Sequence, residues 1–223
     1  DYFFLMLLIF YSGAIIGSFL NVCVYRIPRH ISIIFPGSFC PHCGRPVKWW
    51  NNIPIFSYLY LKGHCAFCRG RISWQYPMIE IGAGLMTIFL YRRFCDYPLF
   101  FFYLQFSYGL LAISWIDMKH RIIPNKILLF LLIIGVIIII LYDIISIYRA
   151  LFNLIISGFI LYFIRTMGGY VLKKDALGLG DLKLGGVIGF YLGWYSFTLA
   201  LLIGSFLAIL VYIIKAFFAS GEI

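Results

Sequence analysis

Long apolar runs alternate along the chain with short polar connections. The clearest run, Tyr97–Ile116, holds 20 residues without a charged side chain. At about 1.5 Å per residue, a helix of this length crosses the roughly 30 Å of hydrocarbon in a bilayer. Six further runs are predominantly apolar: Tyr2–Leu20, Tyr76–Tyr91, Ile127–Tyr142, Tyr148–Ile164, Leu184–Trp194 and Phe197–Ile214. We therefore predict an all-α polytopic membrane protein, a bundle of about seven transmembrane helices.

One long polar stretch separates the first two apolar runs, from Asn21 to Trp74. Five prolines and four glycines punctuate it, which allows turns and short strands but no long helix. A module of about 50 residues buries too little apolar surface to fold without a cross-link such as a disulfide or a structural metal. We predict three parts: a first transmembrane helix (residues 1–20), a loop domain (residues 21–74) and a transmembrane core (residues 75–223).

The composition excludes a soluble protein with a single core. Hydrophobic residues make up 63% of the chain, charged residues make up 12%, and the mean hydropathy is +0.98. Globular chains are about half apolar and a quarter charged. The first apolar run has no basic segment before it, so we interpret it as a transmembrane helix rather than a cleaved signal peptide. The absent initiator Met leads us to expect that a few residues precede Asp1.

The net charge of +10 is distributed unevenly. Seven of the 18 Lys and Arg residues lie in the loop domain, which contains no Asp or Glu. By the positive-inside rule this loop is cytoplasmic, and alternating sides from there places 15 basic residues inside and three outside. The basic charge therefore indicates topology and contact with membrane lipids, and we predict no nucleic-acid partner.

Four cysteines form two CxxC pairs in the loop. Cys40 and Cys43 are followed, after a gap of 21 residues, by Cys65 and Cys68. Four thiolates with this spacing resemble a tetrahedral zinc-ribbon site, and four protein ligands leave no open position for catalysis. The alternative is two disulfides, which are rare in the reducing cytoplasm. We predict a structural zinc ion in a zinc-ribbon-like loop.

The remaining potential ligands have simpler interpretations. His42 and His64 flank the CxxC pairs and could replace a cysteine ligand, although a histidine beside a cysteine ligand is more often a bystander. Cys23 and Cys95 are single cysteines near the predicted membrane boundaries, where packing is the expected role.

Six of the eight acidic residues have ordinary expected roles at the termini, in outside turns, beside surface lysines or near the cytoplasmic membrane face: Asp1, Glu80, Asp96, Asp143, Asp175 and Glu222. For Glu80 the sequence leaves two positions equally open. It either faces the interior or lies at the membrane interface.

Asp117 and Asp181 differ from the other acids. Asp117 directly follows the longest uncharged run, and Asp181 ends a Gly-Leu-Gly-Asp sequence before another apolar run. Alone, each resembles a helix cap or an interfacial ion pair. Two such acids at the predicted cytoplasmic face of the membrane indicate a function, because an acidic side chain in a membrane segment costs free energy. Neighbouring carboxylates share a proton, so one can activate water while the other protonates a scissile carbonyl.

These motifs together resemble those of the type IV prepilin peptidases over most of the chain. The matching segments are Gly17–Val22 with Tyr25–Arg29, the two CxxC pairs, Ile116-Asp117 with Pro124-Asn125, and Gly178–Lys183. The resemblance implies an aspartic endopeptidase of the bacterial cytoplasmic (inner) membrane, with Asp117 and Asp181 catalytic on the cytoplasmic side. Its substrate would be the basic leader of a prepilin or pseudopilin precursor. Members with the zinc loop also N-methylate the product with S-adenosylmethionine.

Two features depart from the family pattern. Asp117 is followed by a more basic run than usual, and a further C-terminal helix is expected after residue 223, giving an eighth helix. Three other interpretations stay open on the sequence. They are a peptidase without methyltransferase activity, an ion-coupled transporter that uses both aspartates as an ion site, and a zinc-stapled scaffold without activity.

Overall fold

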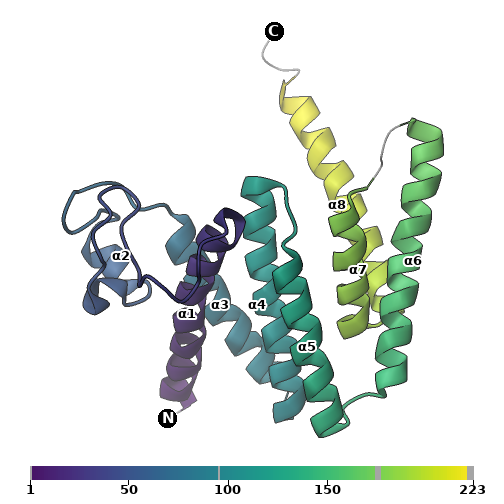
Figure 1. Ribbon diagram of the computed structural model, residues 1–223, viewed down its shortest axis with the longest axis horizontal. Helices are drawn as coiled ribbons and strands as arrows, with labels where there is room; N and C mark the ends of the chain where they lie inside the picture. Colours follow the sequence, from purple (N-terminus) through teal and green to yellow (C-terminus); the bar gives the residue numbers. More distant parts are fainter. Residues whose placement is uncertain (1, 95, 174–176, 220–223) are drawn as a thin grey trace. The chain divides into compact units, whose positions relative to one another are not determined.

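The computed structural model describes residues 2–94, 96–173 and 177–219. Asp1, Cys95, Asp175 and Glu222 lie outside the described residues. The helices are α1 (Tyr2–Arg26), α2 (Phe56–Tyr60), α3 (Gln75–Arg93), α4 (Tyr97–His120), α5 (Asn125–Tyr142), α6 (Ile147–Leu172), α7 (Leu179–Leu192) and α8 (Trp194–Ala219), with short 3-10 helices η1 (Ile27–Arg29) and η2 (Trp49–Asn52). Across the described residues the chain forms helices and no strand, which confirms the predicted all-α class (Figure 1).

Within the described residues, five helices are long and apolar enough to cross a membrane, namely α1, α4, α5, α6 and α8. The two other predicted spans are also helical and correspond to α3 and α7. Helix α7 has only 14 residues, and it ends where Gly193 adopts a φ of 84°. A left-handed backbone there favours glycine and lets α8 begin at the next residue.

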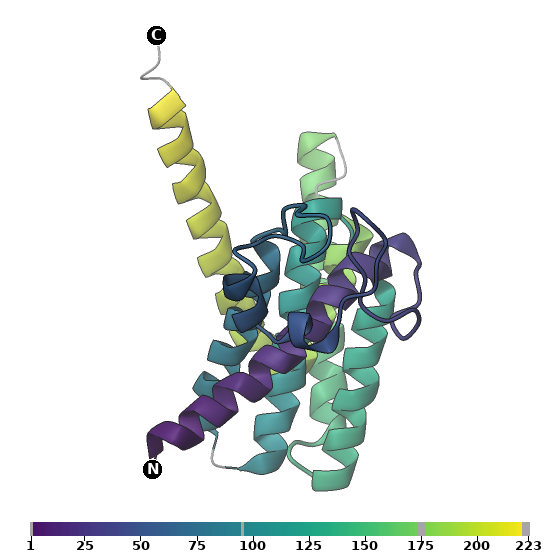
Figure 2. The ribbon, with the colours of Figure 1, turned by 90° about the vertical axis from the view of Figure 1, so that its left-hand side faces the viewer.

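The chain divides into two compact units, residues 1–134 and residues 135–223, and each is described by itself. In the first unit α1 packs along α3, and α4 contacts both of these helices. The loop between α1 and α3 lies beside the C-terminal half of α1 (Figures 1 and 2). Fully buried side chains in this unit include Val24, Ile79, Phe102 and Ile116.

Glycines allow α1 and α3 to approach closely. A Cβ atom on Gly17 would lie 2.7 Å from Cα of Glu80 and 3.0 Å from Cβ of Ala83. Small residues at a helix contact are a common way to gain van der Waals packing inside a membrane. The contact also places Glu80 directly against α1.

We predict that Gly17→Ala destabilises the protein by about 1–3 kcal/mol, because the added methyl group meets backbone that cannot move aside easily. Gly158→Ala is the matched control, since its Cβ would meet nothing within 4 Å in the interior of α6. That change is expected to be neutral or stabilising by up to ~1 kcal/mol. Thermal unfolding of both purified variants in one detergent measures the difference. Equal midpoints would show that the close α1–α3 contact is wrong.

In the second unit α7 packs on α6 and contacts α8. Two polar residues of α6, Asn153 and Ser157, are buried at this contact. A Cβ atom on Gly189 would lie 2.8 Å from the Asn153 carbonyl oxygen, so the helices can approach this closely only with glycine there. This packing fixes α7, whose first turn carries Asp181.

Candidate functional site

The four loop cysteines form one cluster. The sulfur atoms of Cys40, Cys43, Cys65 and Cys68 all lie within 4.8 Å of one another, and those of Cys40 and Cys68 are 3.9 Å apart. A tetrahedral site with Zn–S bonds of about 2.3 Å separates its sulfurs by about 3.8 Å. All four cysteines are free thiols rather than disulfides. The predicted grouping of the two CxxC pairs is therefore confirmed, and the cluster could hold a metal ion.

The two halves of the cluster have the same backbone conformation. In each, the N–H of the first cysteine donates to the carbonyl five residues later, at 2.9 Å and 2.8 Å. The N–H four residues after the cysteine donates back to the cysteine carbonyl, and that residue has a positive φ in both halves. It is Gly44 (69°) in the first and Arg69 (57°) in the second. These repeated turns direct two thiols toward one point.

Charge within the cluster favours a cation. Hydrogen bonds from the backbone N–H groups of Cys68 and Phe67 lower the pKa of the Cys65 thiol to about 6. At Cys68 the Gly70 N–H also lowers the pKa, but desolvation and the neighbouring thiols outweigh it and raise the pKa to about 11. One thiolate thus opposes the ionisation of the next. A dication removes this opposition, so the donor set fits a thiolate-bound metal.

Arg26 anchors the start of the loop. Its side chain is buried, and its guanidinium donates to the carbonyls of Ser32 and Gly37, both at 2.8 Å. The same group lies 5.4 Å from the ring centroid of Phe39. These contacts hold the chain segment that leads into Cys40.

Glu80 anchors the middle of the loop. It is 6% exposed, and its Oε2 accepts a 2.7 Å hydrogen bond from the N–H of Ile55. Ile55 has a φ of 65°, which is strained for a β-branched residue, and such strain is often found at functional sites. Of the two positions left open for Glu80 by the sequence, the structure shows the interior one.

A polar network joins three helix ends in the first unit. Asn21 of α1 donates to the Tyr76 carbonyl at 3.0 Å and accepts from Gln75 at 3.3 Å. Gln75, the first residue of α3, accepts a hydrogen bond from Lys119 at the end of α4. The loop and the end of α4 that carries Asp117 therefore lie at the same end of this unit. The sequence did not predict that Asn21, Gln75 and Lys119 would be partners, although a polar residue such as Asn21 at the edge of an apolar run is a signal of a buried contact.

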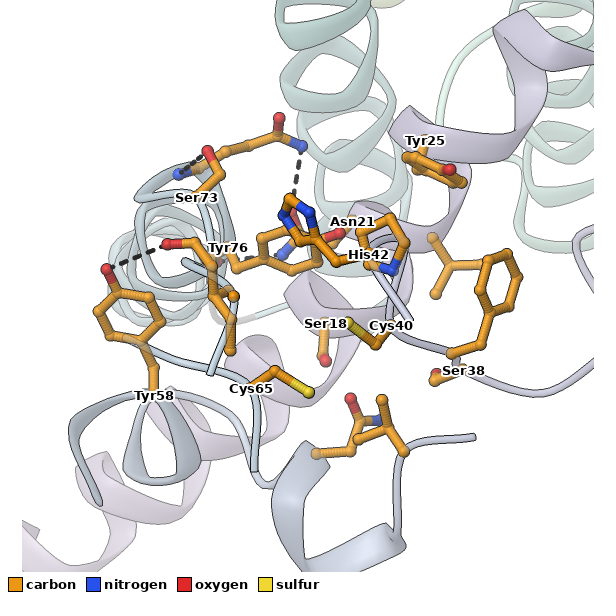
Figure 3. A pocket seen from close by; sticks show the side chains of 18 of the residues that line it. Ser18, Asn21, Tyr25, Ser38, Cys40, His42, Tyr58, Cys65, Ser73 and Tyr76 are labelled. Atoms are coloured by element: carbon orange, nitrogen blue, oxygen red, sulfur yellow. Dashed lines mark hydrogen bonds between the residues drawn. The ribbon is translucent and has the colours of Figure 1, made fainter. Parts of the chain in front are cut away.

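A cavity of about 590 Å³ lies between the loop and these helix ends, and every described residue that lines it belongs to the first unit. Ser18 and Asn21 of α1, Tyr76 of α3, and the cluster residues Cys40 and Cys65 are among its walls (Figure 3). Its volume lies in the range of about 300–1,000 Å³ that is usual for small-molecule sites.

The two aspartates occupy opposite kinds of helix end. Asp117 is exposed in the last turn of α4, where its carbonyl accepts from the Arg121 N–H at 2.8 Å. Asp181 is exposed in the first turn of α7, and its Oδ2 accepts from the Gly178 N–H at 3.1 Å. Asp181 thus caps the start of α7 through one of its two carboxylate oxygens, as the helix-cap interpretation of the sequence allowed. Asp117 belongs to the first unit and Asp181 to the second.

Comparison with known proteins covers both units. Residues 11–94 match the bacterial peptidase A24 N-terminal domain, and residues 104–213 match the type IV leader peptidase family. A Stutzerimonas stutzeri protein named prepilin leader peptidase/N-methyltransferase is 31% identical over 86% of this chain and 75% of its own length. A Klebsiella pneumoniae protein of the same name is 32% identical over 88% of this chain and 89% of its own length. No solved structure matches the chain.

The fold and the site define a polytopic helical membrane protein with a four-cysteine loop and an exposed aspartate at each of two helix ends. The chain belongs to the type IV leader peptidase family, which is a family of aspartic peptidases. The resemblance inferred from the motifs is confirmed over most of the chain.

Proposed function

We propose that this chain is a membrane-embedded aspartic endopeptidase that removes the basic leader of type IV prepilin-like precursors. It then N-methylates the new N-terminal residue with S-adenosylmethionine. The observation that carries the proposal is the presence of Asp117 and Asp181 at helix ends in a chain similar to leader peptidase/N-methyltransferases over most of its length. The same relatives support the methyltransferase half over the peptidase-only alternative, and none of those reported is named as a transporter.

In this proposal the two carboxylates divide the work of peptide hydrolysis. One carboxylate, in its ionised form, activates the water, and the other, in its protonated form, donates a proton to the scissile carbonyl. Asp181 lies in the first turn of α7, where its Oδ2 accepts from the Gly178 N–H, and Asp117 lies in the last turn of α4. Lys119 is held by Gln75, which directs its ammonium to α3.

The metal in this proposal is a structural zinc ion held by Cys40, Cys43, Cys65 and Cys68. The sulfur spacing and the free thiols support it. When bound, zinc supplies a dication that joins the two CxxC turns and orders the loop. No catalytic step involves it.

We place the loop and both aspartates on the cytoplasmic side of the bacterial inner membrane. The seven basic residues of the loop, with no acidic residue among them, support this side. The network from Asn21 through Gln75 to Lys119 supports a shared side for the loop and the end of α4. Anionic headgroups of the inner leaflet would then contact the basic loop.

The precursor should bind mainly through the apolar segment that follows its cleavage point. Its basic leader and the basic loop repel each other, so leader charge contributes little affinity except through anionic lipid. Neutralising the leader charges is therefore expected to lower the cleavage rate only a few-fold, with a salt dependence. A charge placed in the first apolar turns of the precursor should lower the cleavage rate about tenfold or more, because a charge in hydrocarbon costs several kcal/mol. Cleavage rates of the two precursor variants with the opposite ranking would refute this docking.

The test of the proposed function is a product analysis. Purified enzyme is incubated with a prepilin-like precursor, with and without S-adenosylmethionine, and the product masses are read. We expect loss of the leader in both reactions and addition of one methyl group only when the donor is present. An uncut precursor would contradict the peptidase, and a cut but unmethylated product would favour the peptidase-only alternative.

A further inference from the structure

The 590 Å³ cavity holds groups that neither zinc binding nor peptide hydrolysis uses. Aromatic rings from α1, the loop and α3 line it, among them Tyr25, Phe39 and Tyr76. Five Lys and Arg side chains line it as well, but among the described residues of its walls Glu80 is the only acidic one. A ligand that complements these aromatic, acidic and basic walls has a flat aromatic ring, a cationic centre and a carboxylate.

The buried Glu80 carboxylate is a site for a cationic ligand group. Its neighbours are the Ile55 N–H and the Ser18 hydroxyl, and no basic side chain is among the groups that act on it. A buried carboxylate costs free energy unless hydrogen bonds or a cation compensate it. The rings of Tyr25 and Tyr76 in the same cavity suit a cation that is not itself a hydrogen-bond donor.

The basic side chains of the cavity are mostly engaged already. Arg26 donates to loop carbonyls, and Lys119 donates to Gln75. Arg29 donates to the Tyr25 carbonyl and lies 4.1 Å from that ring centroid. Arg45 lies 5.4 Å from the ring centroid of Phe67. A zinc tetrathiolate also carries a net charge of about −2, which offsets part of the surrounding positive charge.

Arg71 is the basic side chain that remains for a ligand. It lines the cavity, and within the described part of the chain its guanidinium makes no hydrogen bond, ion pair or ring contact. A guanidinium recognises a carboxylate through two parallel hydrogen bonds. The cavity thus offers one anionic and one cationic group for the two ends of an amino-acid tail.

We propose that this cavity is the S-adenosylmethionine site, with Tyr25 and Tyr76 beside the adenine or the sulfonium, Glu80 facing the positive charge of the ligand, and Arg71 binding its carboxylate. The proposal rests on the methyltransferase half of the proposed function. It commits to this ligand because the relatives are named N-methyltransferases. In addition, a nucleoside with an amino-acid tail needs an aromatic wall, a carboxylate and a guanidinium in one cavity.

The position of the cavity also fits a reaction that follows cleavage. Lys119 and His120 line it, and they are two and three residues beyond Asp117 on α4. An N-terminal amine released at Asp117 therefore emerges beside the cavity. When bound, the donor supplies a methyl group to the amine lone pair while its sulfur keeps the C–S bonding electrons. Because an α-amino group has a pKa of about 7.7–8.0, part of it is neutral at pH 7 after losing its proton to water.

Ligand binding tests the assignment independently of activity. Equilibrium dialysis of labelled S-adenosylmethionine against the full-length enzyme in detergent compares Glu80→Gln and Arg71→Gln with the wild type. Gln at position 80 keeps an oxygen acceptor for the Ile55 N–H, so the loop keeps its anchor. Each variant is expected to weaken binding about tenfold or more, as for loss of a hydrogen bond to a charged group. Lys48→Gln is the control, because Lys48 is an exposed loop cation outside the cavity, and it should bind within about twofold of the wild type.

A photoreactive azidoadenine analogue of the donor, cross-linked to the wild-type enzyme, should label peptides from residues 18–29 and 38–76. This readout does not depend on any variant folding. Variants that keep wild-type affinity, or labels that map elsewhere while the product is still methylated, would overturn the cavity assignment and leave the proposed function intact. A wild type that neither binds the donor nor methylates would overturn both. Glycerol phosphate binding at this cavity in place of the donor would assign it to a lipid headgroup and reject the proposal.

Discussion

Replacing either Asp117 or Asp181 with Asn is expected to reduce leader cleavage by roughly 10³-fold or more. An amide cannot share a proton with the remaining carboxylate, so water activation and protonation of the carbonyl are lost together. For the same reason the double variant should be no slower than the slower single variant. Cleavage of a prepilin-like precursor by each purified variant, followed by mass analysis, measures the effect.

Asp143→Asn is the matched control for the loss of an acid. Asp143 is exposed in the turn after α5, outside the proposed site, and its φ of 47° suits Asn equally well. It should cleave at the wild-type rate. Zinc content and thermal unfolding of the three variants should equal those of the wild type. Near-normal cleavage by Asp117→Asn or Asp181→Asn would remove that aspartate from the proposed mechanism.

Replacing Cys43 with Ser is expected to remove most of the bound zinc and to disorder the loop. Structural zinc binding is worth about 10–16 kcal/mol in small domains, and a site with three thiolates loses much of it. Apart from the contacts of Arg26 and Glu80, little else holds the loop, because the one α-helix among the described residues 27–74 is the five-residue α2. Elemental analysis of the purified protein and limited proteolysis between residues 27 and 74 measure both effects.

Cys23→Ala provides the control for this change. Cys23 is a buried cysteine of α1 outside the four-cysteine cluster, so its loss should leave the zinc content unchanged. A wild-type protein without zinc, or a Cys43→Ser variant that retains it, would contradict the structural metal. If the account is right, Cys43→Ser also weakens S-adenosylmethionine binding, because Cys40 and Cys65 form part of the cavity wall.

The sequence was sufficient for features that depend on local pattern. Two CxxC pairs predicted the cluster because a short turn directs both thiols of a pair to one point, and the sulfur positions confirm it. Apolar runs located the long helices, but they ended α1 too early. The helix continues to Arg26 because backbone hydrogen bonds do not require apolar side chains, and the buried Arg26 side chain finds loop carbonyls.

Features that depend on distant partners could not be predicted in this way. Gln75 bonds to residues 54 and 44 positions away, and no local pattern specifies such a pair. Glu80 was ambiguous because its partner, the Ile55 N–H, is a backbone group on the loop. The three predicted domains and the pairing of the aspartates stay predictions, since Asp117 and Asp181 lie in separately described units.

The most direct test of the central claim, that one pair of carboxylates performs the cleavage, is disulfide trapping. Asp117→Cys and Asp181→Cys are combined in a chain that keeps the four loop cysteines but has Ala at positions 23 and 95. Carboxylates that share a proton lie about 3 Å apart, and a disulfide forms only when Cα atoms are within about 7 Å. The account predicts efficient oxidation of this pair in membranes, seen as a linked peptide by mass spectrometry, and far less for Met118→Cys with Asp181→Cys. Two accessible thiols at 117 and 181 that never cross-link would contradict it.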